Sequence, residues 1–133
     1  MAISNPYQAY QQNSVNTATP GELTLMLYNG CLKFIQLAKV AMKENNVTDK
    51  NINLQKAQNI ITELMVTLKM DVEISKQMMP LYDFVRRQLI EANVKNDIRA
   101  LEDAEGIVTD FRDTWKQVIQ ANRKLQYNKG GQV

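Results

Sequence analysis

The sequence predicts an all-α protein, an antiparallel up-down four-helix bundle preceded by a short N-terminal cap segment. Apolar residues recur every three or four positions in four segments of the 133-residue chain. Short polar connections separate these segments, which makes consecutive helices antiparallel neighbours. We expect a cap segment over 1–18, flexible or a short helix, a bundle over 19–126, and a disordered tail over 127–133.

The first helix has a clear start signal in the sequence Thr19-Pro20-Gly21-Glu22. Thr19 is suited to cap the helix, Pro20 suits its first position, and Glu22 completes a capping box. We expect this helix to end near Lys43.

The second helix is expected over about 50–69, after a polar connection that begins at Glu44. Thr48 or Asp49 is the expected cap. The apolar residues that step by three and four along this helix are Leu54, Ala57, Ile61, Leu64 and Leu68.

The third helix follows a short break near 70–72. Its expected apolar line is Ile74, Met78, Leu81, Val85, Leu89 and Ala92. Pro80 conflicts with this line, because proline lacks the backbone donor that a helix interior uses. Either the helix is kinked near Met78, or it begins near Pro80 and the preceding residues form a separate turn.

The fourth helix has the clearest periodicity, and Asp97 is its expected cap after a break over 93–96. Its apolar line is Leu101, Ala104, Val108, Phe111, Trp115 and Val118. The residues from Tyr127 onward include Gly130 and Gly131, and we expect them to form a loose tail.

The composition argues against catalysis and against a bound cofactor. The chain has no histidine, the commonest general base and the commonest metal ligand. The single cysteine, Cys31, lies among apolar residues and is expected to be a small buried side chain. We therefore predict no enzyme, no catalytic residues, no metal and no cofactor.

Charge and hydropathy argue against nucleic acids and membranes as partners. The net charge is only +2, and Lys and Glu are mixed along the chain. The first 21 residues carry no charge, so they lack the basic start of a signal peptide. The most apolar stretch, 23–42, is interrupted by Asn, Gln and Lys, which argues against membrane insertion. We expect a cytoplasmic protein.

The first helix carries more apolar residues than one buried face requires. They cover roughly 200° of its circumference at about 100° per residue. Either this helix is the most buried one and contacts two neighbours, or one flank of it lines a groove for a partner helix. Apolar residues opposite the core line of the second helix favour such a groove. The residues that we assign to a client-binding groove are Leu25, Tyr28, Leu32, Val66 and Met70.

The segment before the first helix is uncharged and contains Tyr7 and Tyr10. On one helical turn these two side chains would share a face. The segment is either a disordered tail or a short amphipathic cap that covers the groove when it is empty. As a tethered ligand it would act at a roughly millimolar effective concentration.

Several motifs occur in a specific order between about Asn5 and Gln120. They are Asn5-Pro6-Tyr7-Gln8-Ala9-Tyr10, Val15-Asn16-Thr17-Ala18-Thr19-Pro20-Gly21-Glu22-Leu23, Met26-Leu27-Tyr28-Asn29-Gly30, Lys56-Ala57-Gln58-Asn59-Ile60-Ile61-Thr62-Glu63-Leu64, Leu81-Tyr82-Asp83-Phe84-Val85, Leu89-Ile90-Glu91-Ala92-Asn93 and Phe111-Arg112-Asp113-Thr114-Trp115. As an ordered set they resemble the FliS family of flagellin-specific secretion chaperones in bacteria. Pro80 departs from the family pattern.

The resemblance implies an antiparallel four-helix bundle with an N-terminal cap segment. It implies one-to-one binding of the C-terminal segment of flagellin, which is disordered in the free monomer. The chaperone would prevent premature polymerisation in the cytoplasm and deliver flagellin to the flagellar type III export apparatus. The alternative interpretation is a structural bundle that homodimerises through its surplus apolar face, and the empty chaperone itself could form a weak homodimer.

Overall fold

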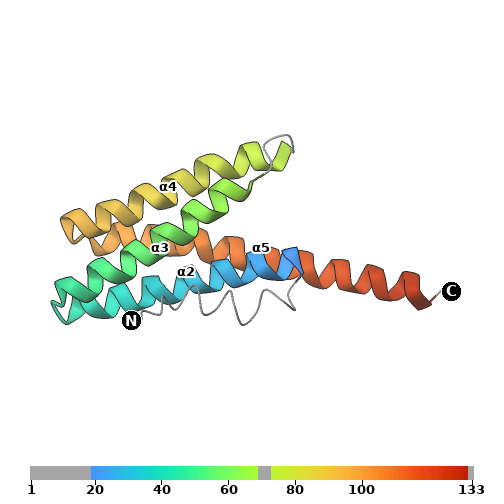
Figure 1. Ribbon diagram of the computed structural model, residues 1–133, viewed down its shortest axis with the longest axis horizontal. Coiled ribbons are helices and arrows are strands. Elements are labelled where there is room, and N and C mark those ends of the chain that lie inside the picture. The colour runs from blue at the N-terminus through green and yellow to red at the C-terminus, as the bar shows by residue number, and fades with distance from the viewer. Residues whose placement is uncertain (1–18, 69–72, 132–133) are drawn as a thin grey trace, which may run out of the picture.

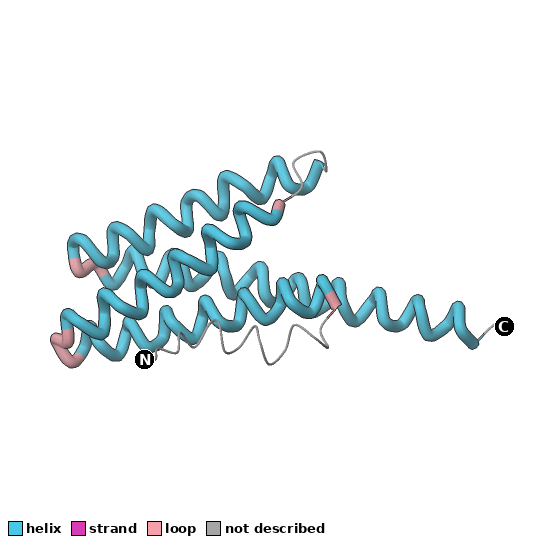
Figure 2. The backbone as a smooth tube through the Cα atoms, viewed as in Figure 1, coloured by secondary structure: helices cyan, strands magenta, loops and turns pink. Residues whose placement is uncertain are grey.

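The computed structural model describes residues 19–68 and 73–131, and in these ranges it consists of four α-helices. They are α2 (Pro20–Lys43), α3 (Val47–Thr67), α4 (Glu73–Lys95) and α5 (Ile98–Gly131). Helices α2 and α4 each pack against both α3 and α5, so α2 and α4 lie on one diagonal of the bundle. Short connections join the helices where the chain is described, and α5 projects beyond the others (Figures 1 and 2). The predicted fold class is confirmed.

Helix α2 begins and ends as the sequence predicts. The Thr19 hydroxyl accepts a hydrogen bond from the backbone N–H of Glu22 at 3.1 Å, and Pro20 occupies the first turn. The helix ends at Lys43 and is followed by Asn45 with a φ of 56°, a left-handed conformation that asparagine tolerates. The start signal in the sequence was therefore sufficient to define this helix.

The predicted cap of α3 was wrong. Asn46, rather than Thr48 or Asp49, caps the helix by accepting a hydrogen bond from the backbone N–H of Asp49 at 3.0 Å. Helix α3 consequently begins at Val47 instead of near Lys50. An asparagine three residues before an aspartate provides this pairing locally, because its side-chain oxygen reaches the third amide of the helix.

Helix α4 continues through Pro80, which excludes the alternative that the helix begins there. Its predicted apolar line was wrong in the first half, because Ile74 and Leu81 are 56% and 43% exposed. Ser75 and Tyr82 are buried in their place, one residue further along the helix. The spacing of three and four is kept, but the buried face is rotated relative to the prediction.

Helix α5 confirms the predicted cap and most of the predicted line. Asp97 Oδ1 accepts hydrogen bonds from the amides of Arg99 and Ala100 at 3.0 and 3.2 Å. Leu101 and Val108 are fully buried. The helix then continues to Gly131, where the sequence predicted a disordered tail over 127–133. The expected break over 70–72 and the cap segment over 1–18 lie outside the described residues.

The core contains an aromatic cluster that joins the two diagonal helices. The hydroxyls of Tyr28 on α2 and Tyr82 on α4 form a buried hydrogen bond of 2.6 Å. The Phe111 ring of α5 lies 5.8 Å from the ring of Tyr28 and 5.2 Å from that of Tyr82. Burial raises the pKa of both phenols, so both remain protonated at neutral pH.

Cys31 lies in the same core and is fully buried, as its apolar neighbours in the sequence predict. Burial raises the pKa of its thiol to about 12, because the charged thiolate would lose its hydration. The thiol is therefore protonated at neutral pH and unsuited to nucleophilic chemistry.

We expect Tyr28→Phe to destabilise the protein by about 1–3 kcal/mol, because it leaves the buried Tyr82 hydroxyl without a partner. The double variant Tyr28→Phe/Tyr82→Phe should cost less than the sum of the two single variants. Urea unfolding of the four proteins measures this coupling. Strictly additive effects would show that the hydrogen bond makes no pairwise contribution.

Candidate protein-binding surface

The structure does not bring the five predicted groove residues together on one surface. Tyr28 is 1% exposed and Leu32 is 9% exposed, so both belong to the core. Leu25 is partly exposed, and Val66 on α3 is 75% exposed. Met70 lies outside the described residues, as do the proposed cap residues, which are Tyr7 and Tyr10.

The burial of Tyr28 and Leu32 has a simple cause. Helix α2 packs against both α3 and α5, so two neighbours cover its wide apolar arc. Of the two interpretations of this arc, the structure therefore supports the one in which the helix is unusually buried. The sequence alone could not distinguish them, because both place the same side chains on the same flanks of the helix.

The exposed apolar residues that the sequence missed lie on α4, on the row that faces α5. Ile74, Leu81 and Gln88 are seven residues apart and share one side of the helix. Gln88 Nε2 lies 3.5 Å from Asp103 Oδ2 on α5, which shows that this row faces α5. Towards the start of α4 the two helices diverge (Figure 2), and Ile74 and Leu81 are left exposed.

Helix α5 presents apolar side chains opposite this row. Ile107 and Phe111 are only partly buried and pack against the edge of the core. We refer to Ile74, Leu81, Ile107 and Phe111 together as the α4–α5 face. It is an apolar strip between two diverging helices, and such strips suit an amphipathic helix whose anchors recur at three, four and seven residues. A core line beginning Ser75-Met78-Tyr82 would have identified it from the sequence.

Polar contacts on the other sides of the bundle tie the helices in two pairs. On α5, the Trp115 indole Nε1 donates to the carbonyl of Gly21 at 2.7 Å, and Arg123 pairs with Glu22. Further along the same pair of helices, Lys39 of α2 forms an ion pair with Glu105 of α5 at 3.0 Å. These contacts hold α2 to α5 along most of the length of α2.

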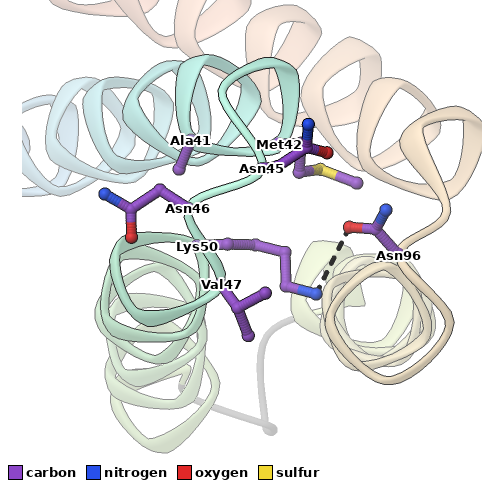
Figure 3. Close-up of a pocket in the computed structure, with 7 residues that line it drawn as sticks. All are labelled: Ala41, Met42, Asn45, Asn46, Val47, Lys50 and Asn96. Atoms are coloured by element: carbon purple, nitrogen blue, oxygen red, sulfur yellow. Dashed lines mark hydrogen bonds between the residues drawn. The ribbon is translucent and has the colours of Figure 1, made fainter.

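The second pair, α3 and α4, is tied at the opposite end of these helices by a buried lysine. Lys50 is 7% exposed, and its ammonium donates to the carbonyl of Asn93 at 3.1 Å and to Asn96 Oδ1 at 3.3 Å. Figure 3 shows it crossing a cavity of about 270 Å³ towards Asn96. The cation thus satisfies carbonyl groups at the C-terminal end of α4.

The contacts between the two pairs are mainly apolar. Besides the hydrogen bond between Tyr28 and Tyr82, they include the 3.9 Å contact of the Cys31 thiol with the carbonyl of Ala57. Apolar contacts are non-directional, so they permit small shifts of one pair against the other. The described residues can therefore offer an adaptable apolar face to a partner.

The described part of the chain offers little for catalysis. It contains no group of three or more His, Cys, Asp or Glu side chains that could hold a metal ion. None of the helices over 19–68 and 73–131 is long and apolar enough to cross a membrane.

Comparison with known proteins adds independent evidence. A family model described as "Flagellar protein FliS" matches residues 3–122. The flagellar secretion chaperone FliS of Bacillus subtilis (strain 168) is 61% identical over 131 residues, which cover 98% of each chain. The FliS chaperone of Escherichia coli (strain K12) is 32% identical and covers 90% of this chain and 93% of its own.

A solved structure described as a flagellar chaperone from bacteria superposes with a TM-score of 0.72 at 20% identity. The match covers 87% of this chain and 96% of the solved chain. At this level of identity the likeness concerns the fold, and it agrees with the helical bundle described above.

We expect Lys50→Met to destabilise the bundle by about 1.5–3 kcal/mol, because it removes hydrogen bonds from a charged donor to Asn93 and Asn96. Lys33→Met is the matched control, since Lys33 is exposed on α2 and should change stability by less than about 0.5 kcal/mol. Thermal and urea unfolding measure both. Equal stability of the two variants would mean that the buried ammonium contributes nothing net.

Proposed function

This chain belongs to the FliS family of flagellar secretion chaperones, and on that premise we propose that it binds the disordered C-terminal segment of flagellin one-to-one. Bound in this way, flagellin cannot polymerise prematurely in the cytoplasm, and the complex delivers it to the flagellar type III export apparatus. The family is one of chaperones rather than enzymes. The homology to proteins named flagellar secretion chaperones supports the proposal.

The observation that carries the proposal is the exposed apolar α4–α5 face. Ile74 and Leu81 lie two helical turns apart, which matches the repeat of an amphipathic helix. A disordered client loses about 2–5 kcal/mol or more in ordering when it folds on binding. Each buried Leu, Ile or Val returns roughly 1.5–3 kcal/mol, so a handful of anchors offsets this cost.

The residues predicted from the sequence divide into two groups in this proposal. Leu25 and Val66 are accessible and remain candidate client contacts. Tyr28 and Leu32 would reach a client only if the α3–α4 pair moved away from the α2–α5 pair. Met70 stays an expectation from the sequence, because it lies outside the described residues.

We also propose that the segment over 1–18, through Tyr7 and Tyr10, covers the client surface when no client is bound. Its covalent tether gives it a roughly millimolar effective concentration, so weak docking suffices to suppress contacts between copies. A client that buries more apolar area displaces it. Without this cover, the empty chaperone would form a weak homodimer.

The client surface is tested by isothermal titration of the full chain with a peptide of flagellin's C-terminal segment. Ile74→Glu should weaken binding about tenfold or more, because a carboxylate would be buried against apolar side chains. The control is Val94→Glu on the same helix, at a site that is 76% exposed on the outer side, and it should bind like the wild type. Circular dichroism confirms that both variants fold and that the bound peptide gains helix.

Two results would contradict this prediction in different ways. Failure of the wild-type chain to bind the peptide at high micromolar concentration would reject flagellin as the client. Equal affinities of Ile74→Glu and Val94→Glu, with binding intact, would remove the α4–α5 face as the site and leave Val66, tested by Val66→Glu, as the next candidate.

Deletion of residues 1–17 should raise self-association of the empty protein, because the tethered cover is lost. Sedimentation of the deleted and full chains over a range of concentrations measures the effect. An unchanged monomeric mass would reject the cover. A full chain that dimerises and does not bind flagellin would favour the alternative, in which the chain is a structural homodimer.

A further inference from the structure

The C-terminal part of α5 extends beyond the rest of the bundle. Helix α5 has 34 residues, whereas α2, α3 and α4 have 24, 21 and 23 in the described ranges. The contact between Arg123 and Glu22 pairs α5 with the first turn of α2, which begins at Pro20. The helix beyond Arg123 therefore projects past the bundle, as the red end of α5 in Figure 1 shows.

The charge of this extension is one-sided. After Asp113 the sequence contains no Asp or Glu, while it contains Lys116, Arg123, Lys124 and Lys129. Attraction between cations and the helix dipole is confined to the last turn. It does not account for Lys116 and Lys124, which lie two or more turns before the end of the helix.

The extension also carries an exposed apolar row. Val118 and Leu125 are seven residues apart, so they share one side of the helix, and they are 38% and 59% exposed. Lys116 and Lys124 are exposed as well. Arg123, in contrast, is already paired with Glu22 within the chain.

We propose that residues 116–131 of α5 form a docking helix for an acidic surface of a second protein. The row of Val118 and Leu125 lies against an apolar strip of that partner, and Lys116 and Lys124 pair with its carboxylates. This site is separate from the flagellin site of the proposed function. A helix without neighbours is only marginally stable in water, so a partner along it would also stabilise it.

The side chains favour a protein over a membrane as the occupant. Helices that lie on a bilayer carry a large apolar face with Trp, Phe and Leu. Here the exposed row over the described side chains comprises Val118 and Leu125, and the indole of Trp115 is bound to Gly21. An acidic protein surface with a narrow apolar strip fits this geometry better.

The first experiment is carbodiimide cross-linking of the full-length chain in cells of its source bacterium. This reagent joins a lysine to a carboxylate with which it is in contact. We expect cross-links from Lys116 or Lys124 to Asp or Glu residues of one partner protein, identified by mass spectrometry of the linked peptides. Absence of cross-links from both lysines, with cross-links recovered elsewhere on the chain, would overturn the proposal.

The second experiment measures the affinity of the full-length chain for that purified partner. Lys116→Glu/Lys124→Glu should weaken binding about tenfold or more, and wild-type binding should weaken as salt rises. Lys33→Glu/Lys43→Glu makes the same change in net charge at exposed sites on α2 and should bind like the wild type. Leu125→Ser should also weaken binding, with no change in net charge.

Equal affinities of the two charge-reversed proteins would overturn the proposal. So would binding of the full-length chain to anionic phospholipid vesicles that Lys116→Glu/Lys124→Glu abolishes, with no effect of this variant on the protein partner. The flagellin peptide is titrated against the same variants and should bind them normally. This result separates a failure of the docking helix from a failure of the proposed function.

Discussion

The hydrogen bond between Tyr28 and Tyr82 is the constraint on which the arrangement of the bundle depends. It joins two helices that are not neighbours, across the middle of the core. A buried hydroxyl needs a partner, so Tyr82 must face Tyr28, and this requirement sets the rotation of α4 about its axis. With α4 in that rotation, Ile74 and Leu81 cannot enter the core, and the apolar surface proposed for client binding results.

The polar contacts define how the bundle can respond to a partner. They tie α2 to α5 through Trp115 and Lys39, and α3 to α4 through Lys50, whereas the two pairs meet mainly through apolar side chains. The structure is therefore firm within each pair and more adaptable between pairs. A chaperone that receives a disordered client benefits from such a division, because the receiving face can adjust without loss of the fold.

Much of the bundle could be predicted from local sequence signals. Thr19 and Asp97 cap their helices as expected, and Cys31 is buried as its neighbours suggest. The candidate site could not be predicted in the same way. Tyr28 and Leu32 were assigned to a groove because an apolar arc does not show how many neighbours a helix has, and only packing reveals that α2 has two on its apolar side.

The sequence by itself determined four helices, most of their boundaries, the lack of histidine chemistry and the family. These follow from caps, spacing and ordered motifs, which act over a few residues. Only the tertiary structure decided which side of α4 is buried. Two apolar lines one residue apart, through Leu81 or through Tyr82, satisfy the same helical period. The choice between them was made by Tyr28, a partner 54 residues away in the chain, with which Tyr82 shares its hydrogen bond.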